Sequence, residues 1–288
     1  MPAALDALAA TDAYRVDGVV SIWCAPAATP ATPAFARSEQ APHYAASTMK
    51  VALMLAAHRL ADAGELDLDE AVEVHDRFTS GFGGDFTVDE HDDSDPQVWA
   101  RRGERVPLRW LVERSIVRSS NLATNLVLER TGLAPVGAAW AVVGGDSCRT
   151  ERMIEDRPAA AAGRTNVVDA RGLALLVGAI AAGAEDPPAG TAPASPTACR
   201  EMLAALYAQE FRDCVVRGLP AGTRLGHKTG SITGVQHDVA LVEPADAAAY
   251  LLAICTSTSL DGPTARGLLT RIAAASWADR HELGGARS

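Results

Sequence analysis

The chain has 288 residues, of which 48% are hydrophobic and 22% charged, and its formal net charge is −10. This composition is typical of a globular protein that is long enough for a large core and two lobes. No cluster of Lys and Arg stands out, which argues against nucleic acid or a membrane surface as partners, and no apolar run is long enough to span a bilayer. We expect a small-molecule substrate and a monomer.

The N-terminal segment and the cysteines bear on the compartment. Residues 1–20 lack the basic stretch followed by an apolar stretch that marks a signal peptide. The five cysteines are odd in number and scattered, with no C-x-x-C spacing, which is typical of reduced, buried thiols. We therefore expect a cytoplasmic protein, unless a misassigned start codon hides a leader.

The first part of the chain predicts two strands and a central helix. Residues 15–24 alternate loosely and are rich in β-branched side chains, and a second strand is expected near 34–39. Residues 48–63 are rich in helix formers and apolar on nearly all sides, so this helix should be buried. Residues 79–97 are rich in Gly and Asp, which predicts an exposed loop. The acidic run around His91 has no metal-loop spacing and favours a solvated turn over a metal site.

The remaining pattern places helices in the middle of the chain and strands at its end. Two short helices are expected within 107–132, with a break near Arg118. Further helices are expected within 144–185, at 196–211 and at 262–280, and strands at 223–232, 235–243 and 249–257. Strands at both ends predict an α/β (α+β) fold, in which an antiparallel sheet from both termini is flanked by helices. We expect an α/β lobe at 1–46 and 215–288, and an inserted all-helical lobe at 47–214.

Lysine is the rarest basic residue of this chain. It occurs only as Lys50 and Lys228, whereas Arg is used everywhere else. Arg cannot lose its proton in a protein, but the pKa of a Lys falls readily when the side chain is buried. The two lysines are therefore candidates for chemistry that Arg cannot perform. The alternative is that they are chance survivors on the surface.

The first lysine belongs to an S-x-x-K pattern at the start of the predicted central helix. Residues three apart share a helix face, so the hydroxyl of Ser47 and the amine of Lys50 are expected within hydrogen-bond reach. A serine hydroxyl becomes a good nucleophile only when a base takes its proton, and a neutral Lys can be that base. The pattern alone also arises by chance, and for this motif by itself a purely structural role is favoured.

Two further polar groups complete the set. Ser119, Ser120 and Asn121 lie at the predicted break between two helices, where they either face a cleft or cap the second helix, and the two roles are compatible. Lys228 lies on a predicted strand with Thr229, Gly230 and Ser231, and a Gly inside a strand often marks the close approach of a backbone or a ligand. A lysine there can hold an anionic group and keep Lys50 uncharged by repulsion.

These three motifs, in this order, resemble those of the penicillin-recognising serine enzymes, most closely the class A β-lactamases. The resemblance runs from about residue 35 to residue 258. It implies a serine-dependent hydrolase that forms an acyl-enzyme from a lactam, amide or ester next to an anionic group, with no cofactor and no metal. Ser47 would be the nucleophile, Lys50 the proton acceptor, and Ser119 the relay of a proton to the leaving nitrogen.

The same resemblance implies the substrate-binding residues. Asn121 would bind a substrate amide, and Lys228 and Thr229 would hold the substrate carboxylate. The backbone N–H groups of Ser47 and Ser231 would form the oxyanion hole, where the loss of one donor typically costs about 3–4 kcal/mol in the barrier.

Three departures from the family pattern affect the expected activity. Ser120 replaces an Asp whose role is mainly structural. Ile154 stands where class A enzymes carry the Glu that activates the deacylating water, and Glu155 follows one residue late. The usual Arg after the K-T-G strand is missing. His237 lies in that region and either assists in binding a carboxylate or is a packed or capping residue, and we favour the packed or capping role.

These departures predict slow deacylation. Glu155 either serves from its displaced position or is a surface residue, and we favour the surface role. Two alternative functions stay open: a transacylase in small-molecule biosynthesis, and a β-lactam-binding or sensing module without turnover.

Overall fold

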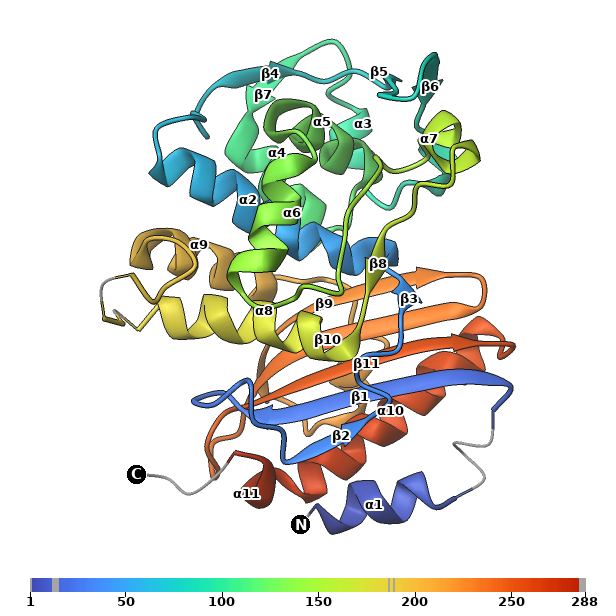
Figure 1. Cartoon of the computed structure of the whole chain (residues 1–288), viewed down its shortest axis with the longest axis vertical. Helices are drawn as coiled ribbons and strands as arrows, with labels where there is room; N and C mark the ends of the chain where they lie inside the picture. The colour runs from blue at the N-terminus through green and yellow to red at the C-terminus, as the bar shows by residue number, and fades with distance from the viewer. Residues whose placement is uncertain (1, 12–15, 186, 189, 285–288) are drawn as a thin grey trace.

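A five-stranded antiparallel sheet built from both ends of the chain organises the fold (Figure 1). The computed structural model describes residues 2–11, 16–185, 187–188 and 190–284. The strand order is β2-β1-β11-β10-β9, with bounds Phe35–Arg37, Gly18–Pro26, Tyr250–Thr258, Val235–Glu243 and Arg224–Ile232. All five predicted strands are confirmed, with small differences at their ends. Arg15, the first residue of the first predicted strand, lies outside the described residues.

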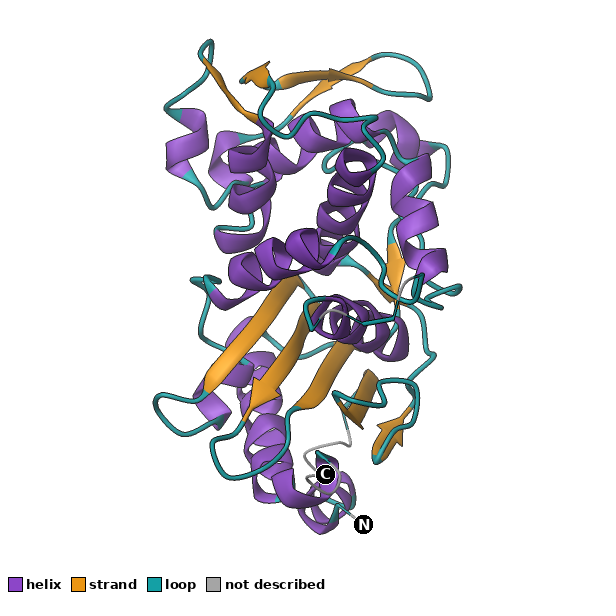
Figure 2. Ribbon diagram, turned by 90° about the vertical axis from the view of Figure 1, so that its left-hand side faces the viewer, coloured by secondary structure: helices purple, strands orange, loops and turns teal. Residues whose placement is uncertain are grey.

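Helices cover both faces of this sheet (Figures 1 and 2). On one face α8 (Ala170–Gly183) and α9 (Pro196–Tyr207) pack against the strands, and on the other α10 (Gly262–Ala278) does so. The helix α1 (Ala3–Ala9), which the sequence did not predict, packs on α10, and α11 (Arg280–Leu283) follows α10. Because both faces are covered, the central strands β10 and β11 are almost continuously buried. The predicted fold class is confirmed.

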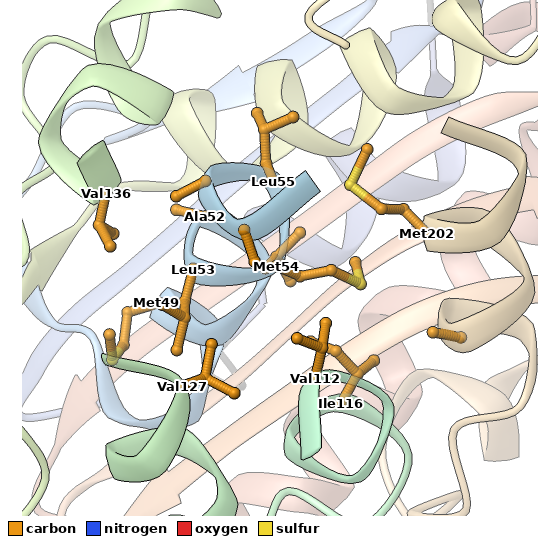
Figure 3. Close-up of a cluster of buried hydrophobic side chains, with 14 of the residues drawn as sticks. Met49, Ala52, Leu53, Met54, Leu55, Val112, Ile116, Val127, Val136 and Met202 are labelled. Atoms are coloured by element: carbon orange, nitrogen blue, oxygen red, sulfur yellow. The ribbon is translucent and has the colours of Figure 1, made fainter. Parts of the chain in front are cut away.

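The remaining helices surround α2 (Lys50–Asp62), which is buried from its first residue through His58. It packs against α4 (Leu108–Val117), α5 (Asn121–Thr131), α6 (Ala134–Val142) and α9. Figure 3 shows Leu53 and Leu55 of α2 pointing into this core. Truncation of a buried Leu to Ala costs about 2–5 kcal/mol, so α2 is a firm base for the residues at its start. The predicted central helix is confirmed.

The start of this helix differs from the prediction in its geometry. A 3₁₀ turn, η2 (Ala46–Met49), precedes the α-helix, and Ser47 lies inside it. Both the backbone N and the hydroxyl of Thr48 donate to the carbonyl of Ala45, at 3.1 and 2.6 Å, and these bonds hold the tight turn. Residues three apart eclipse each other in a 3₁₀ helix, so Ser47 and Lys50 project from the same side.

Short elements fill the connections. Three two-stranded ribbons pair β3 with β8, β4 with β7 and β5 with β6. Their bounds are His43–Tyr44, Val167–Val168, Ala71–Glu73, Arg105–Pro107, Arg77–Thr79 and Asp85–Thr87. The short helices are η3 (Glu90–Asp92), α3 (Pro96–Trp99), α7 (Arg157–Ala161) and η4 (Val215–Gly218).

The segment 79–97, predicted as an exposed loop, therefore carries regular structure. Its ribbon is held by the buried rings of Phe78 and Phe86, whose centroids lie 5.7 Å apart. The division into lobes at 46/47 and 214/215 stays a prediction.

Two further properties concern the described residues. All five cysteines are buried and unpaired, as the sequence predicted. No helix in the described ranges combines the length and the apolar character that a membrane crossing requires.

Candidate active site

The three sequence motifs meet at one cavity of about 210 Å³ between the sheet and the helices above it. Five of the seven predicted site residues line it: Ser47, Ser119, Asn121, Thr229 and Ser231. The two lysines lie directly behind this lining, and both bind Ser119. The remaining lining residues are Asp92, Ser94, Phe211 and Gly230.

Ser47 lies where strand β9 passes against the turn η2. A Cβ atom added to Gly230 would lie 3.0 Å from the backbone N atoms of both Ser47 and Thr48. Any side chain at 230 would therefore separate the strand from the turn, which confirms the close approach predicted from this Gly. Ala46, just before Ser47, has a φ of 45°, an unusual value for a residue with a Cβ.

Ser119 connects the two lysines and has a strained backbone. It lies between α4 and α5 with a φ of 56°, and such a conformation costs about 1–3 kcal/mol. Its carbonyl accepts a hydrogen bond of 2.7 Å from Nζ of Lys50, and its hydroxyl accepts one of 2.9 Å from Nζ of Lys228. These two bonds help to hold the left-handed conformation that directs the Ser119 side chain to the cavity.

Lys50 is fully buried and makes its hydrogen bonds on the helical side of the cavity. Besides the Ser119 carbonyl, it donates to Oδ1 of Asn121 at 2.8 Å. Burial lowers the pKa of Lys50 to about 7, against the opposing effect of the Asp93 and Glu155 carboxylates. A substantial neutral fraction therefore exists at neutral pH. Among the described residues, Nζ of Lys50 does not form the expected hydrogen bond with the hydroxyl of Ser47.

Lys228 is also fully buried, and it donates to the carbonyl of Thr229 at 2.8 Å as well as to Ser119. Burial lowers the pKa of Lys228 well below its ordinary value, and the neighbouring charge of Lys50 acts in the same direction. Neither lysine is a surface residue, so the alternative of two survivors on the surface is wrong.

Ser120 caps the helix α5, as the sequence allowed. Its hydroxyl accepts a hydrogen bond of 3.0 Å from the backbone N of Ala123 and donates one of 3.0 Å to Oδ2 of Asp93. The same oxygen of Asp93 accepts a bond of 2.8 Å from the backbone N of Leu122. A carboxylate from the loop 89–95 thus stabilises the N-terminus of α5, where the helix dipole favours negative charge.

The segment that contains Ile154 is fixed beside the site by Asn125 of α5. The side chain of Asn125 binds both the backbone N and the carbonyl of Ile154, each at 2.8 Å. Glu155 follows with a φ of 60°, and its carboxylate accepts a hydrogen bond of 3.0 Å from the backbone N of Asp89. Burial raises the pKa of Glu155. Neither Ile154 nor Glu155 lines the cavity.

His237 is a packed residue, as expected. It is fully buried on β10, where its Nε2 donates to the carbonyl of Tyr44 at 2.8 Å and its Nδ1 accepts from the backbone N of Thr256 at 3.1 Å. Burial lowers the pKa of His237 to about 4, so the ring is neutral at physiological pH.

Sequence reasoning missed three residues of the cavity wall: Asp92, Ser94 and Phe211. Arg118 joins two of them, since it donates to the carbonyl of Ser94 at 2.9 Å and lies 5.7 Å from the ring centre of Phe211. The acidic run at 89–95 is the available signal for Asp92, although its spacing favours a solvated turn. Phe211 is the last residue of the helix predicted at 196–211, but α9 ends at Tyr207, so Phe211 lies in the loop that follows.

The sequence profile of the beta-lactamase enzyme family matches residues 3–279. The chain belongs to this family. A search of curated proteins finds no match.

Solved structures of beta-lactamases share the fold over nearly the whole chain. The beta-lactamase of Sphaerobacter thermophilus is 28% identical, with a TM-score of 0.76, over 96% of this chain and 95% of that one. A beta lactamase of Xanthomonas campestris is 20% identical, with a TM-score of 0.77, over 96% and 97%. An ancestral class A beta-lactamase is 22% identical, with a TM-score of 0.74, over 95% and 99%. Family and fold support a serine hydrolase of the beta-lactamase type that acts on small molecules.

Proposed function

We propose that this protein forms an acyl-enzyme on Ser47 from a lactam, amide or ester that lies next to an anionic group, and then hydrolyses it slowly. The observation that carries the proposal is the meeting of two fully buried lysines at Ser119, on the wall of the cavity that Ser47 lines. A buried pair of lysines with lowered pKa values is costly for a fold, and it suits a site that transfers protons.

Acylation follows from these positions. The Oγ atom of Ser47 attacks the carbonyl carbon, and its proton passes to neutral Lys50, directly or through a water. The carbonyl electron pair moves onto oxygen, where the backbone N–H groups of Ser47 and Ser231 stabilise the charge. The C–N bond then breaks and its electron pair goes to nitrogen. Ser119 gives that nitrogen a proton and recovers one from Lys50, whose Nζ lies 3.5 Å from the Ser119 hydroxyl.

The opposite wall of the cavity suits the anionic group of the substrate. Thr229 and Ser231 line it, with Lys228 behind them. A substrate carboxylate here favours the protonated form of Lys228, because an opposite charge raises the pKa of a lysine. Asn121, on the helical wall, has an amide that can bind a substrate amide.

Deacylation needs a second base that activates water, and neither Ile154 nor Glu155 places one on the cavity wall. Ile154 takes the position of the usual Glu, and the carboxylate of Glu155 is bound to the backbone of Asp89. General-base assistance is typically worth about 10²–10⁴-fold, so the acyl-enzyme should persist. A long-lived acyl group can also pass to an amine, which is the transacylase alternative.

Product formation from nitrocefin, measured with and without added amines, separates these functions. A burst near one equivalent followed by slow, sustained hydrolysis supports the proposal. Turnover that depends on an amine identifies a transacylase, and a single equivalent without further turnover identifies a sensing module. Absence of any reaction with Ser47 would refute the acyl-enzyme itself.

A further inference from the structure

Asp92 is the only one of the nine residues lining the cavity that carries a formal charge. It ends the turn η3, and its carbonyl accepts a hydrogen bond of 3.1 Å from Nδ2 of Asn121. This bond fixes the backbone of Asp92 next to the residue that we propose as the ligand of the substrate amide. The exposed carboxylate of Asp92 is therefore held at the same wall.

Three neighbouring acids, Asp89, Asp93 and Asp95, are occupied within the protein. Asp93 caps α5 and binds Ser120, and Asp95 forms a two-pronged ion pair with Arg114. Asp89 accepts a hydrogen bond of 2.9 Å from the backbone N of His91. By contrast, the Asp92 carboxylate takes part in none of the hydrogen bonds or ion pairs found between described residues. It is thus available to a ligand.

The cations that contact the lining of this wall are bound to other groups, and Arg157 lies close enough to Glu155 to lower the pKa of that carboxyl group. The guanidinium of Arg118, which lies behind Ser94 and Phe211, is paired with Glu210 at 2.6 Å. The two lysines are buried behind the cavity and bound to Ser119. Glu155 lies near enough that Asp92 raises the pKa of its carboxyl group. The helical side of the entrance is therefore negative, whereas the strand side is suited to an anion.

We propose that Asp92 selects substrates that carry an ammonium group on the acyl side of the bond that is cleaved. This inference rests on the proposed function, because the acyl side is defined by Asn121. The preferred substrate is then a zwitterion, with its carboxylate at Thr229 and Ser231 and its ammonium group at Asp92. An attraction between exposed charges is modest and screened by salt, so the selection is expected to amount to about threefold to tenfold in acylation rate.

Three penicillins provide a matched series for the test. Benzylpenicillin, ampicillin and carbenicillin share one side chain and carry hydrogen, an ammonium group or a carboxylate at the same carbon. The second-order acylation rate of each is measured by intact mass for the wild type and for Asp92→Asn. Glu90→Gln is the control, since Glu90 is exposed in the same turn but does not line the cavity.

The wild type should prefer ampicillin to benzylpenicillin and benzylpenicillin to carbenicillin. Asp92→Asn should reduce the ratio of the ampicillin rate to the carbenicillin rate by about threefold to tenfold. Glu90→Gln should keep the wild-type ratio. An unchanged ratio in Asp92→Asn overturns the inference.

A binding measurement separates this inference from the proposed function. The affinities of the same three penicillins are measured by calorimetry for Ser47→Ala, with and without Asp92→Asn. If the wild type is not acylated at all, the proposed function fails. The ratio of the ampicillin affinity to the carbenicillin affinity, measured by calorimetry, then still decides the role of Asp92. A ratio that depends on Asp92 supports charge selection, and one that does not refutes it.

Discussion

The Nζ atom of Lys228 lies 2.9 Å from the hydroxyl of Ser119. Lys50 binds the carbonyl of the same residue from the other side, at 2.7 Å. Ser119 is therefore the point where the second and third sequence motifs join the first. The two lysines are 178 positions apart in sequence. They meet at Ser119 because the strand β9, which carries Lys228, packs against the turn η2, which precedes Lys50. Each lysine side chain is fully buried and each pKa is lowered, which supports the hypothesis that both positions require Lys rather than Arg.

Lys50 should set the pH dependence of acylation. Burial lowers its pKa to about 7, so its neutral form, which accepts the proton of Ser47, predominates only above that pH. The acylation rate of the wild type should rise from pH 5, reach half of its maximum near pH 7 and level off above about pH 8. Lys50→Arg should lose about 10²–10⁴-fold, because a guanidinium stays charged throughout this range. The measurement is the rate of labelling with a fluorescent penicillin as a function of pH.

Lys228→Arg is the matched comparison. It keeps a positive charge for the substrate carboxylate but places a larger group in a fully buried site, so it should retain part of the acylation rate. Wild-type rates for Lys50→Arg would show that Lys50 is not the base.

The left-handed backbone conformation of Ser119 should destabilise the fold, and replacement by Gly should remove this strain. Ser119→Ala and Ser119→Gly both remove the hydroxyl, but only Ala keeps a Cβ atom at a φ of 56°. Since such a conformation costs about 1–3 kcal/mol and Gly adds chain entropy to the unfolded state, the Gly variant should be more stable by about 1 kcal/mol. Urea unfolding of the two variants measures the difference, and both should acylate more slowly than the wild type. Greater stability of the Ala variant would contradict the assignment of strain to this residue.

Gly230→Ala should disturb the site without adding any polar group. The new Cβ atom would lie 3.0 Å from the backbone N atoms of Ser47 and Thr48, and backbone cannot move aside by changing a rotamer. Overpacking of this kind costs about 1–3 kcal/mol. The same shift would move the proposed oxyanion donors, so acylation should slow at least tenfold, or about 1.4 kcal/mol in the barrier.

The control for this change is Gly81→Ala, because a Cβ atom there meets nothing within 4 Å. Thermal unfolding and acylation rates are measured for both variants. If Gly230→Ala behaves like Gly81→Ala, the strand does not hold the turn in place.

Deacylation should limit turnover. Benzylpenicillin should accumulate as an acyl-enzyme in a rapid-quench experiment, with a burst near one equivalent and a slow steady state. Ile154→Glu should speed the slow phase if the bonds from Asn125 hold the new carboxylate at the site. Glu155→Ala should leave the slow phase unchanged, because the Glu155 carboxylate is bound to Asp89 and does not line the cavity. Turnover without a burst, or an acyl-enzyme that accumulates only in Glu155→Ala, would contradict this account.

The parts of the fold that sequence reasoning predicted have a strong local signal. The strands β10 and β11 contain several β-branched side chains, and α2 is apolar on nearly all sides, so these elements were found with nearly correct ends. The helix α1 was missed because its seven residues carry little periodic signal. The hairpin of β5 and β6 was missed because the Gly- and Asp-rich composition of 79–97 hides the buried ring of Phe86, which packs on that of Phe78 just before this segment.

The site shows the same limit. The motifs identified Ser47, Ser119 and the two lysines, because each motif is continuous in sequence. Asp92 and Phe211 reach the cavity only through long-range contacts, the bond from Asn121 to the carbonyl of Asp92 and the contact of Arg118 with the ring of Phe211. No pattern along the chain records such contacts. The hydrogen-bond partners of Lys50 could not be predicted from the sequence either, since its Nζ binds Asn121 and Ser119 rather than Ser47.

The most direct test of the central claim is the intact mass of the protein during reaction with benzylpenicillin. The wild type should gain the mass of one intact penicillin, and peptide mapping should place it on Ser47. Ser47→Ala should stay unmodified while its circular dichroism matches the wild type. Unchanged labelling of Ser47→Ala, or labelling of the wild type at another residue, would contradict the account.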